Sequence, residues 1–325
     1  MPIFRKHSKH RAFSLQKNDY LKAVLLLNLA GLFWAGNLIA GSLLSDYVGP
    51  GFIVASRAVA GSMIFILVIR FGGRRDILSG VKSWPLLVLM SLSGVLGFQI
   101  FLYLGLRYTT PINAGLMNAL TPLATALLSA IFLREQLQRS QWLAAAITVV
   151  GVGWILSGGQ LSVLLALDLN IGDMLMLLAV LSWSIYGMAG RRVMLTMSAL
   201  ETTAIGLFLS VIPAMSLATV EGFFFIKPQL NGLVIGVLAF VCIGPTVLSL
   251  FWWNRGVQLI GPSQAALYLN VIPVYAILLA VFLLDATLSR SDIIGASLVL
   301  GGSLYGGISA VMGNRVRLSS QKLDS

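Results

Sequence analysis

The chain has 325 residues, of which 58% are hydrophobic and only 10% are charged, and its mean hydropathy is +0.91. Soluble domains carry about 25% charged residues, so this composition excludes a water-soluble fold and predicts a protein embedded in a lipid bilayer. The net charge of +11 falls in short segments between apolar runs rather than on one polar face, which favours membrane topology over nucleic-acid binding.

Apolar runs of about 20 residues, each long enough to cross a bilayer as a helix, follow one another along the chain. The expected spans cover residues 22–45, 51–71, 84–106, 112–132 and 141–157, and then 172–190, 201–220, 231–253, 263–283 and 292–311. The fold class is therefore all-α and polytopic, with ten transmembrane helices. The expected organisation is a basic tail (1–21), a first five-helix repeat (22–158), a linker (159–171), a second five-helix repeat (172–312) and a second tail (313–325).

The basic residues support this count, because cytoplasmic loops are rich in Lys and Arg. With the N-terminus inside, most of the 22 Lys and Arg residues fall in the tails and in the cytoplasmic loops. The outer loops hold only Arg107, Lys227 and Arg290, and Arg57 alone lies within a span. Both termini are therefore expected in the cytoplasm.

The two halves share a sequence pattern. Trp34 in the first expected span matches Trp183 in the sixth, and Pro122 matches Pro273 at a nearly constant offset. Because each half has five spans, an odd number, the second half enters the membrane from the opposite side. The pattern predicts an inverted-topology repeat, with a substrate site near the bilayer midplane between the halves.

Chemistry that needs clustered ionisable groups is not expected. All acidic residues fall in loops, in tails or near span ends, so the usual buried acid of a proton relay is missing. Cys242 is the one cysteine, and His7 and His10 lie in the basic tail. The sequence therefore predicts no catalytic residue, no metal and no cofactor.

Arg57 is the first candidate for a functional residue, because a charge within the bilayer costs about 2.5–3.5 kcal/mol. Two interpretations remain open: the side chain extends outward to the membrane surface, or it faces a cavity and pairs with an anionic substrate group. Aromatic and amide side chains near span centres are the other candidates. The residues expected to bind substrate are Trp34, Asn37, Arg57, Gln99, Tyr103, Asn118, Trp183, Tyr186, Tyr268 and Asn270.

Alternatives stay open for several of these residues. Mid-span tryptophans also serve helix packing, and buried amides also bond across helices. The tryptophans near span ends are expected to be interfacial anchors; they are Trp84, Trp142, Trp252 and Trp253. Pro122 and Pro273 are matched candidates for gating elements, although static bends explain them equally well.

Several short motifs together resemble one known family. They are Ala55-Ser56-Arg57, the run from Tyr103 to Thr109, the run from Asn118 to Pro122, Leu133-Arg134-Glu135, Trp253-Asn254-Arg255 and the run from Ala265 to Pro273. Over about residues 22–312 the chain resembles the EamA-type transporters of the drug/metabolite transporter superfamily. The resemblance implies a ten-helix carrier with a central cavity that moves metabolites, such as amino acids, outward across the bacterial inner membrane.

The sequence departs from the pattern of the EamA-type transporters in three places. The second half has Asp285-Ala286 where the family often has Gly-Glu, and Gly206 stands opposite Arg57 in the repeat. The first span has no glutamate of the kind on which four-span drug exporters of the superfamily rely, which argues against polyspecific cation export.

The function expected from the sequence is that of a secondary transporter working by alternating access. Its expected partners are a small-molecule substrate and the bilayer, and the sequence indicates no oligomeric state. Two alternatives are a membrane sensor or scaffold without transport and a membrane-embedded lipid-modifying enzyme. The enzyme would need a polar catalytic cluster at the membrane interface, which the sequence does not show.

Overall fold

The computed structural model describes residues 17–71, 81, 83–133, 139–160, 162, 170–193, 196–260, 268–269, 271–302 and 305. Within these residues the regular elements are helices, and no strand occurs. Two of them, η1 and η2, are π-helices. The elements are α1 (Lys17–Leu44), α2 (Pro50–Phe71), α3 (Trp84–Met90), η1 (Ser91–Phe98), α4 (Gln99–Gly105), α5 (Pro111–Asn118), α6 (Thr121–Leu133), α7 (Arg139–Leu156), α9 (Ile171–Val193), α10 (Ala199–Phe224), α11 (Gly232–Val241), η2 (Cys242–Leu248), α12 (Ser249–Ile260) and α14 (Val271–Leu284). Residues 290–302 are also helical.

Six helical segments of the described chain are long and apolar enough to cross a bilayer. They are Asp19–Leu44, Pro50–Phe71, Trp84–Gly105, Ile171–Gly190, Leu200–Phe224 and Gly232–Trp253. Two further apolar helices, Trp142–Gly151 and Val271–Leu284, are shorter. The prediction of an all-helical, multi-pass membrane protein is confirmed, and the count of ten spans stays a prediction.

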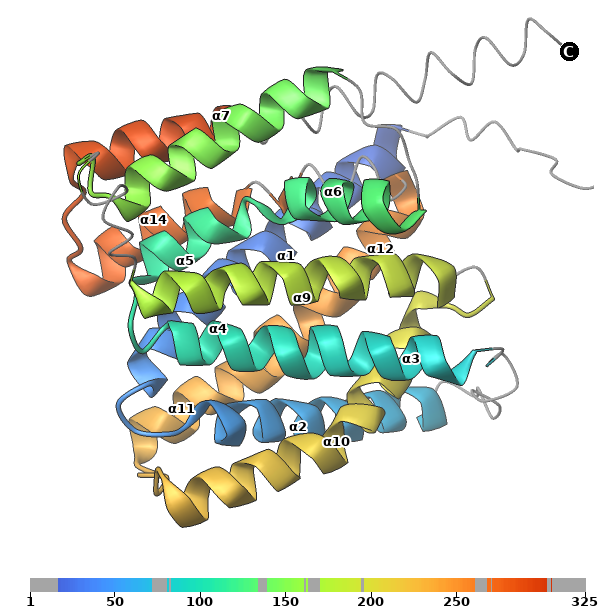
Figure 1. Ribbon diagram of the computed structural model, residues 1–325. Coiled ribbons are helices and arrows are strands. Elements are labelled where there is room, and N and C mark those ends of the chain that lie inside the picture. The colour runs from blue at the N-terminus through green and yellow to red at the C-terminus, as the bar shows by residue number, and fades with distance from the viewer. Residues whose placement is uncertain are drawn as a thin grey trace, which may run out of the picture.

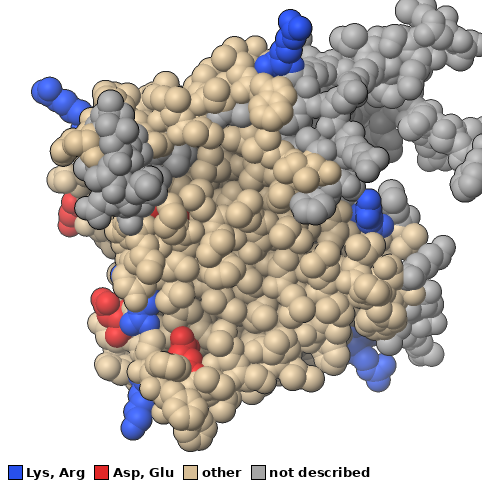
Figure 2. Space-filling view, viewed as in Figure 1, with Lys and Arg blue, Asp and Glu red and all other residues tan. Residues whose placement is uncertain are grey.

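The long helices lie side by side, as Figure 1 shows. We name the two ends of this bundle after α2: the Pro50 end, where α2 begins, and the Arg70 end, where it finishes. Helices α1 and α9, which the sequence repeat matches to one another, run in opposite directions (Figure 1). Charged side chains gather toward the two ends of the face seen in Figure 2, and the middle of that face carries none. Such a band suits contact with lipid tails.

Helix starts explain several of the boundaries. Pro111 opens α5, where its missing N–H needs no partner, and the Thr110 side chain accepts a hydrogen bond from the Asn113 N–H at 3.1 Å. Helix α10 begins with a capping box in which Ser198 and Glu201 exchange bonds of 3.3 and 2.9 Å. These caps set where the helices enter the bundle.

Pro122 and Pro273 also stand near helix starts. The fourth expected span is two helices, α5 and α6, with a break at 119–120, and Pro122 is the second residue of α6. Pro273 is the third residue of α14. In the first turn a proline leaves no hydrogen bond unmade. Neither proline therefore kinks a continuous helix in this structure, and a gating role for them stays a prediction.

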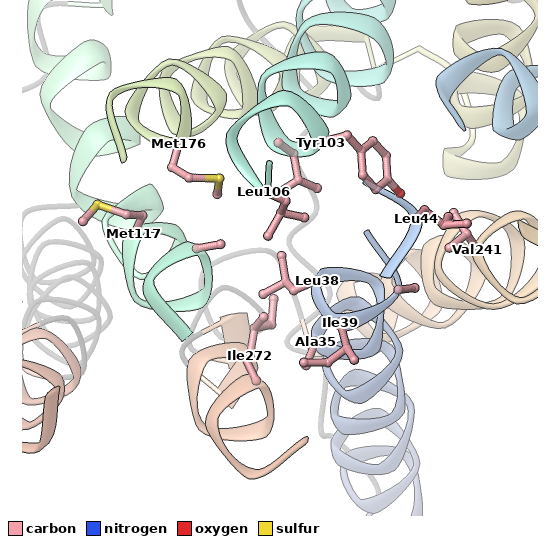
Figure 3. Packing of buried hydrophobic residues seen from close by; sticks show 14 of the residues in the cluster. Ala35, Leu38, Ile39, Leu44, Tyr103, Leu106, Met117, Met176, Val241 and Ile272 are labelled. Carbon is pink, nitrogen blue, oxygen red and sulfur yellow. The ribbon is translucent and has the colours of Figure 1, made fainter. Parts of the chain in front are cut away.

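The buried core is continuous toward the Pro50 end and divided toward the Arg70 end. One large cluster joins side chains from several helices, including Leu38, Leu106 and Met176, which Figure 3 shows converging. Toward the Arg70 end the buried residues that the structure describes form three separate clusters. These are centred on Leu87 with Val193, on Ala23 with Leu27, and on Phe65 with Leu207. The helices are thus packed together at one end of the molecule and into smaller groups at the other.

Candidate functional site

A cavity lies in the middle of the bundle, among α1, α2, η1, α9, α10 and η2. It holds about 1020 Å³ of empty space, including the open solvent at its mouth. Of the residues expected to bind substrate, those on its wall are Trp34, Asn37, Arg57, Gln99, Asn118, Trp183 and Tyr186.

Arg57 is held in place on one wall of the cavity. Its side chain is only 5% exposed, and its Nη1 donates hydrogen bonds to Asn37 Oδ1 at 2.6 Å and to the Tyr103 hydroxyl. The Tyr103 hydroxyl in turn donates to Asn37 Oδ1 at 2.6 Å. Arg57 is therefore buried on the cavity wall rather than extended to the membrane surface, and its pairing with an anionic substrate group stays a prediction.

The charge of Arg57 has no acidic counterpart in this wall. The lining described by the structure includes no Asp or Glu, and the partners of the guanidinium are a neutral amide and a phenol. The Arg57 side chain also lies 5.7 Å from the Tyr103 ring centre. A buried cation without an anion is costly, so the cavity carries a net positive charge that an anionic group can compensate.

Aromatic rings form the opposite wall. The Trp183 ring is stacked on Tyr186 at 4.8 Å, contacts Phe98 at 5.0 Å and meets the edge of Trp34 at 6.2 Å. The Trp34 ring also contacts Trp253 at 5.5 Å. The interpretation of Trp253 as an interfacial anchor is therefore wrong, because its ring packs inside the bundle. Such a wall suits an apolar group, and it also attracts a cation through the ring faces.

The π-helix η2 connects the two walls. Pro245 has no N–H, so the Val241 carbonyl loses the partner that an α-helix would supply, and the Thr246 hydroxyl donates to it instead at 2.8 Å. The Pro245 carbonyl accepts a bond of 3.2 Å from the Trp34 indole N–H in the first half of the chain. The matched helix of the first half holds the other π-helix, η1. Short π-helical segments of this kind are frequent at functional sites.

Most of the lining comes in pairs of positions that the sequence repeat makes equivalent. Trp34 contacts its own partner, Trp183, so the boundary between the two halves passes through the cavity. The pairs are Trp34 and Trp183, Asn37 and Tyr186, Val54 and Thr203, Arg57 and Gly206, Gly94 and Pro245, Val95 and Thr246, Gln99 and Leu250, Asn118 and Leu269, and Thr121 and Ile272.

Hydrogen bonds between the two halves join helices at the Pro50 end. Phe52 N–H, at the start of α2, donates to Glu221 Oε2 at the end of α10 at 3.1 Å. A Cβ atom at Gly49 would lie 2.1 Å from the Glu221 carboxyl carbon, so only glycine allows this approach. The Thr109 hydroxyl donates to Asp173 Oδ1 at 2.5 Å, and Gln229 N–H donates to the carbonyl of residue 47 at 2.9 Å. These contacts close the bundle at that end.

Three residues expected at the site lie elsewhere or outside the described residues. Tyr103 is 1% exposed and stands behind Arg57 rather than on the wall. Tyr268 does not line the cavity, because it precedes α14 and packs against Ala23 and Leu27 of α1. Asn270 lies outside the described residues.

Other lining residues carried no signal in the sequence. Gly94, Gly206 and Thr203 are common residue types in membrane helices, and only the folded structure brings them to one cavity. Within the described chain, no three His, Cys, Asp or Glu side chains come together in a way that could hold a metal ion. The described lining can therefore bind a ligand through one cation, neutral amides and aromatic rings.

Comparison with known proteins gives the chain a family. The uncharacterized transporter YyaM of Bacillus subtilis is 30% identical over 263 residues, which cover 79% of this chain and 84% of that protein. The probable terminal-alkyne amino-acid exporter of Streptantibioticus cattleyicolor is 22% identical, over 86% of this chain and 92% of its own. A solved crystal structure with 21% identity superposes on 90% of this chain and 98% of its own with a TM-score of 0.63, which shows a shared fold.

The family match covers both halves of the chain. The model of the EamA-like transporter family matches residues 21–157 and, a second time, residues 170–305. These two matches leave out little beyond the tails and the linker. The chain therefore belongs to the EamA-like transporter family and is a membrane transporter.

Proposed function

We propose that this transporter is a secondary carrier that exports small metabolites, such as amino acids, by alternating access. In this proposal ten spans form two inverted five-helix repeats in a bacterial inner membrane, with both termini in the cytoplasm. The Arg70 end then faces the cytoplasm, and the Pro50 end faces outward. The opposite directions of α1 and α9 support the inversion (Figure 1).

The environment of Arg57 is the observation that carries the proposal. A guanidinium that is 5% exposed and bonded only to neutral groups is suited to an anionic ligand group. The aromatic rings of Trp34 and Trp183 stand on the same cavity and suit an apolar group. A small molecule with a carboxylate and an apolar side chain fits both features, and the relative named as an amino-acid exporter is consistent with that class.

The uneven packing supports alternating access. The core is continuous at the Pro50 end, where Glu221 and Asp173 bond across the halves, and the described part of it at the Arg70 end is split into three clusters. We assign this arrangement to a state in which the cavity is accessible from the Arg70 end. Export then requires these clusters to join and the bonds at the Pro50 end to break.

Flux through proteoliposomes tests the proposal. Purified protein is reconstituted, the vesicles are loaded with radiolabelled leucine, phenylalanine or alanine, and the label remaining is followed over time. Loss of label faster than from empty vesicles is expected for at least one amino acid. If neither these amino acids nor any other small metabolite offered shows flux, the proposal is overturned, and a sensor or a lipid-modifying protein is favoured.

A substitution series at Arg57 adds the matched control. Arg57→Ala removes the buried cation, while Asn37 and Tyr103 keep the bond to each other. Flux is expected to fall by at least about tenfold, since a hydrogen bond between a guanidinium and a substrate anion contributes about 1.5–3 kcal/mol. Arg57→Lys keeps the charge and is expected to retain part of the flux. Arg192→Ala removes an exposed cation at the end of α9 and is expected to transport like the wild type. Equal flux in Arg57→Ala and wild type would exclude Arg57 from the site.

A further inference from the structure

We infer that the two halves of the chain divide the substrate between them: the first half holds a polar head group, and the second half holds an apolar body. The inference deepens the proposed function and rests on it, because it takes the central cavity as the substrate site. It assigns a different specificity role to the two members of each repeat pair.

The paired lining positions carry this division. Four pairs have a polar or charged residue in the first half and an apolar residue or glycine in the second. These are Arg57 with Gly206, Gln99 with Leu250, Asn118 with Leu269, and Thr121 with Ile272. An even distribution would place amide and charged side chains in both halves, whereas those described on this wall all come from the first half. In these four pairs the polar side of the cavity comes from the first repeat, and the apolar side comes from the second.

Two pairs have the reverse order, and in one of them the hydroxyl group is engaged within the fold. They are Val54 with Thr203 and Val95 with Thr246. The Thr246 hydroxyl donates to the Val241 carbonyl at 2.8 Å, which compensates for Pro245. Thr203 also has an interaction partner within the protein. The Thr246 hydroxyl therefore serves the fold, and the second-half lining that the structure describes offers no amide or charged side chain as a second head-group subsite.

The first half presents both a fixed donor and an unused acceptor. Arg57 is held by Asn37 and Tyr103, so its orientation is set before a ligand arrives. Gln99 lies on the same cavity, and its Oε1 atom is buried without any hydrogen-bond partner. A buried acceptor without a partner is rare in folded proteins. Together the two residues match a head group with an anionic oxygen and a hydrogen-bond donor.

Among the lining residues that the structure describes, the second half presents no amide side chain and no charged group. Leu250, Leu269 and Ile272 contribute aliphatic side chains to the cavity, and Tyr186 is stacked on Trp183 at 4.8 Å. Gly206 adds no side chain opposite Arg57, so that position leaves room for the head group. The substrate class that fits is a small amphipathic carboxylate that carries a donor beside the carboxylate, such as an α-amino acid with an aliphatic or aromatic side chain.

Exchanging one pair of residues separates the two roles. Gln99→Leu gives the first half the residue of its repeat partner, Leu250→Gln does the reverse, and the double variant exchanges both. Binding to detergent-solubilised protein is measured by thermal stabilisation, and transport by competition with labelled leucine in proteoliposomes. Head-group probes are leucine, 4-methylpentanoate without the amino group, and leucinamide without the carboxylate. Body probes are alanine, leucine and phenylalanine.

The expected results differ for the two variants. Wild type is expected to prefer leucine to 4-methylpentanoate by about tenfold, as a site with an unpaired acceptor rejects a ligand without the donor. Gln99→Leu is expected to lose this preference and to bind alanine, leucine and phenylalanine in the same order of affinity as the wild type. Leu250→Gln is expected to keep the preference for leucine over 4-methylpentanoate. Its affinity for phenylalanine is expected to fall by about tenfold relative to its affinity for alanine. The double variant is expected to show both defects.

Other results would overturn the division. They are a Gln99→Leu variant that keeps the head-group preference, or a double variant that regains wild-type selectivity, which would make the two positions interchangeable. Gln99→Met and Leu250→Met serve as second variants of similar volume if either exchange impairs folding. Because thermal stabilisation does not require transport, a wild type that binds with the expected preferences but moves no solute would refute the transport proposal alone. A wild type that moves amino acids without head-group preference would refute the division alone.

Discussion

Replacing Gly94 by alanine is expected to narrow the cavity from its aromatic side. A Cβ atom at Gly94 would lie 2.2 Å from Cδ2, 2.4 Å from Cγ and 2.7 Å from Cβ of Tyr186. Ordinary contact begins near 3.4 Å, so the Tyr186 side chain has to move by about 1.2 Å in a close-packed interior. Rotation of the ring does not relieve the overlap, because the Tyr186 Cβ is also too close. Trp183, stacked on that ring at 4.8 Å, is displaced with it.

The cost follows from overpacking, which destabilises a protein by about 1–3 kcal/mol. Alanine otherwise favours a helix over glycine, so only the contact with Tyr186 explains a loss at Gly94. The melting temperature of the purified variant is expected to fall by about 2 °C or more. Transport of phenylalanine is expected to fall several-fold more than transport of alanine, because the smaller cavity excludes the larger body first. Both are measured on the same preparation.

Two further variants make the explanation at Gly94 refutable. In Gly94→Ala with Tyr186→Ala the obstructing ring is gone, and the melting temperature is expected to recover in part. Gly206→Ala is the matched control for stability, because its Cβ would meet the flexible end of Met90 at 3.2 Å and Val95 Cγ2 at an ordinary 3.9 Å. Two results would show that steric exclusion by Tyr186 does not cause the effects of Gly94→Ala. One is a wild-type ratio of phenylalanine to alanine flux in Gly94→Ala. The other is a further fall of the melting temperature when Tyr186→Ala is added.

Two other substitutions test the contacts between the halves. Trp34→Phe leaves the Pro245 carbonyl without its donor and is expected to lower the free energy of unfolding by about 1–3 kcal/mol. Calorimetry compares this variant with Trp183→Phe. Equal melting temperatures of the two variants would contradict the role of the bond. Glu221→Gln weakens a carboxylate bond at the Pro50 end by about 1 kcal/mol, which shifts the equilibrium about fivefold toward a state open there. In a variant without the native cysteine, Val54→Cys is then expected to react about fivefold faster with an impermeant maleimide added outside, and an unchanged rate would exclude Glu221 as a latch.

Periodic and compositional features of the chain were enough to predict its class. Long apolar runs have one stable solution in lipid, the helix, because every backbone group must be satisfied within the segment. Arg57 stood out for a related reason, since a charge in a span needs partners, but the sequence did not decide between the membrane surface and a cavity. Trp34 and Trp183 were predictable together, because matched mid-span positions lie near the boundary of two repeats.

Contacts that depend on the third dimension were not predictable. Trp253 stands near a span end, which is typical of an interfacial anchor, yet its ring packs on Trp34. Tyr268 shares the residue type of the cavity aromatics but lies on the side of the chain that packs against Leu27. The π-helices have no periodicity of their own in so few residues, and the approach of Tyr186 to Gly94 depends on how two distant helices are placed. Spacing along a chain does not contain this information.

The contact between Trp34 and Trp183 bears on how such a cavity can arise. In a dimer of two identical half-length chains, residues at equivalent positions are the same residue, and a two-fold interface brings the same surface patch together from both subunits. Arg57 would then face a second Arg57, and the glutamine at position 99 would face its own copy. A cavity with one polar and one apolar wall is not available to that assembly. Joining both copies in one polypeptide removes the constraint, because each wall can then change its residues independently.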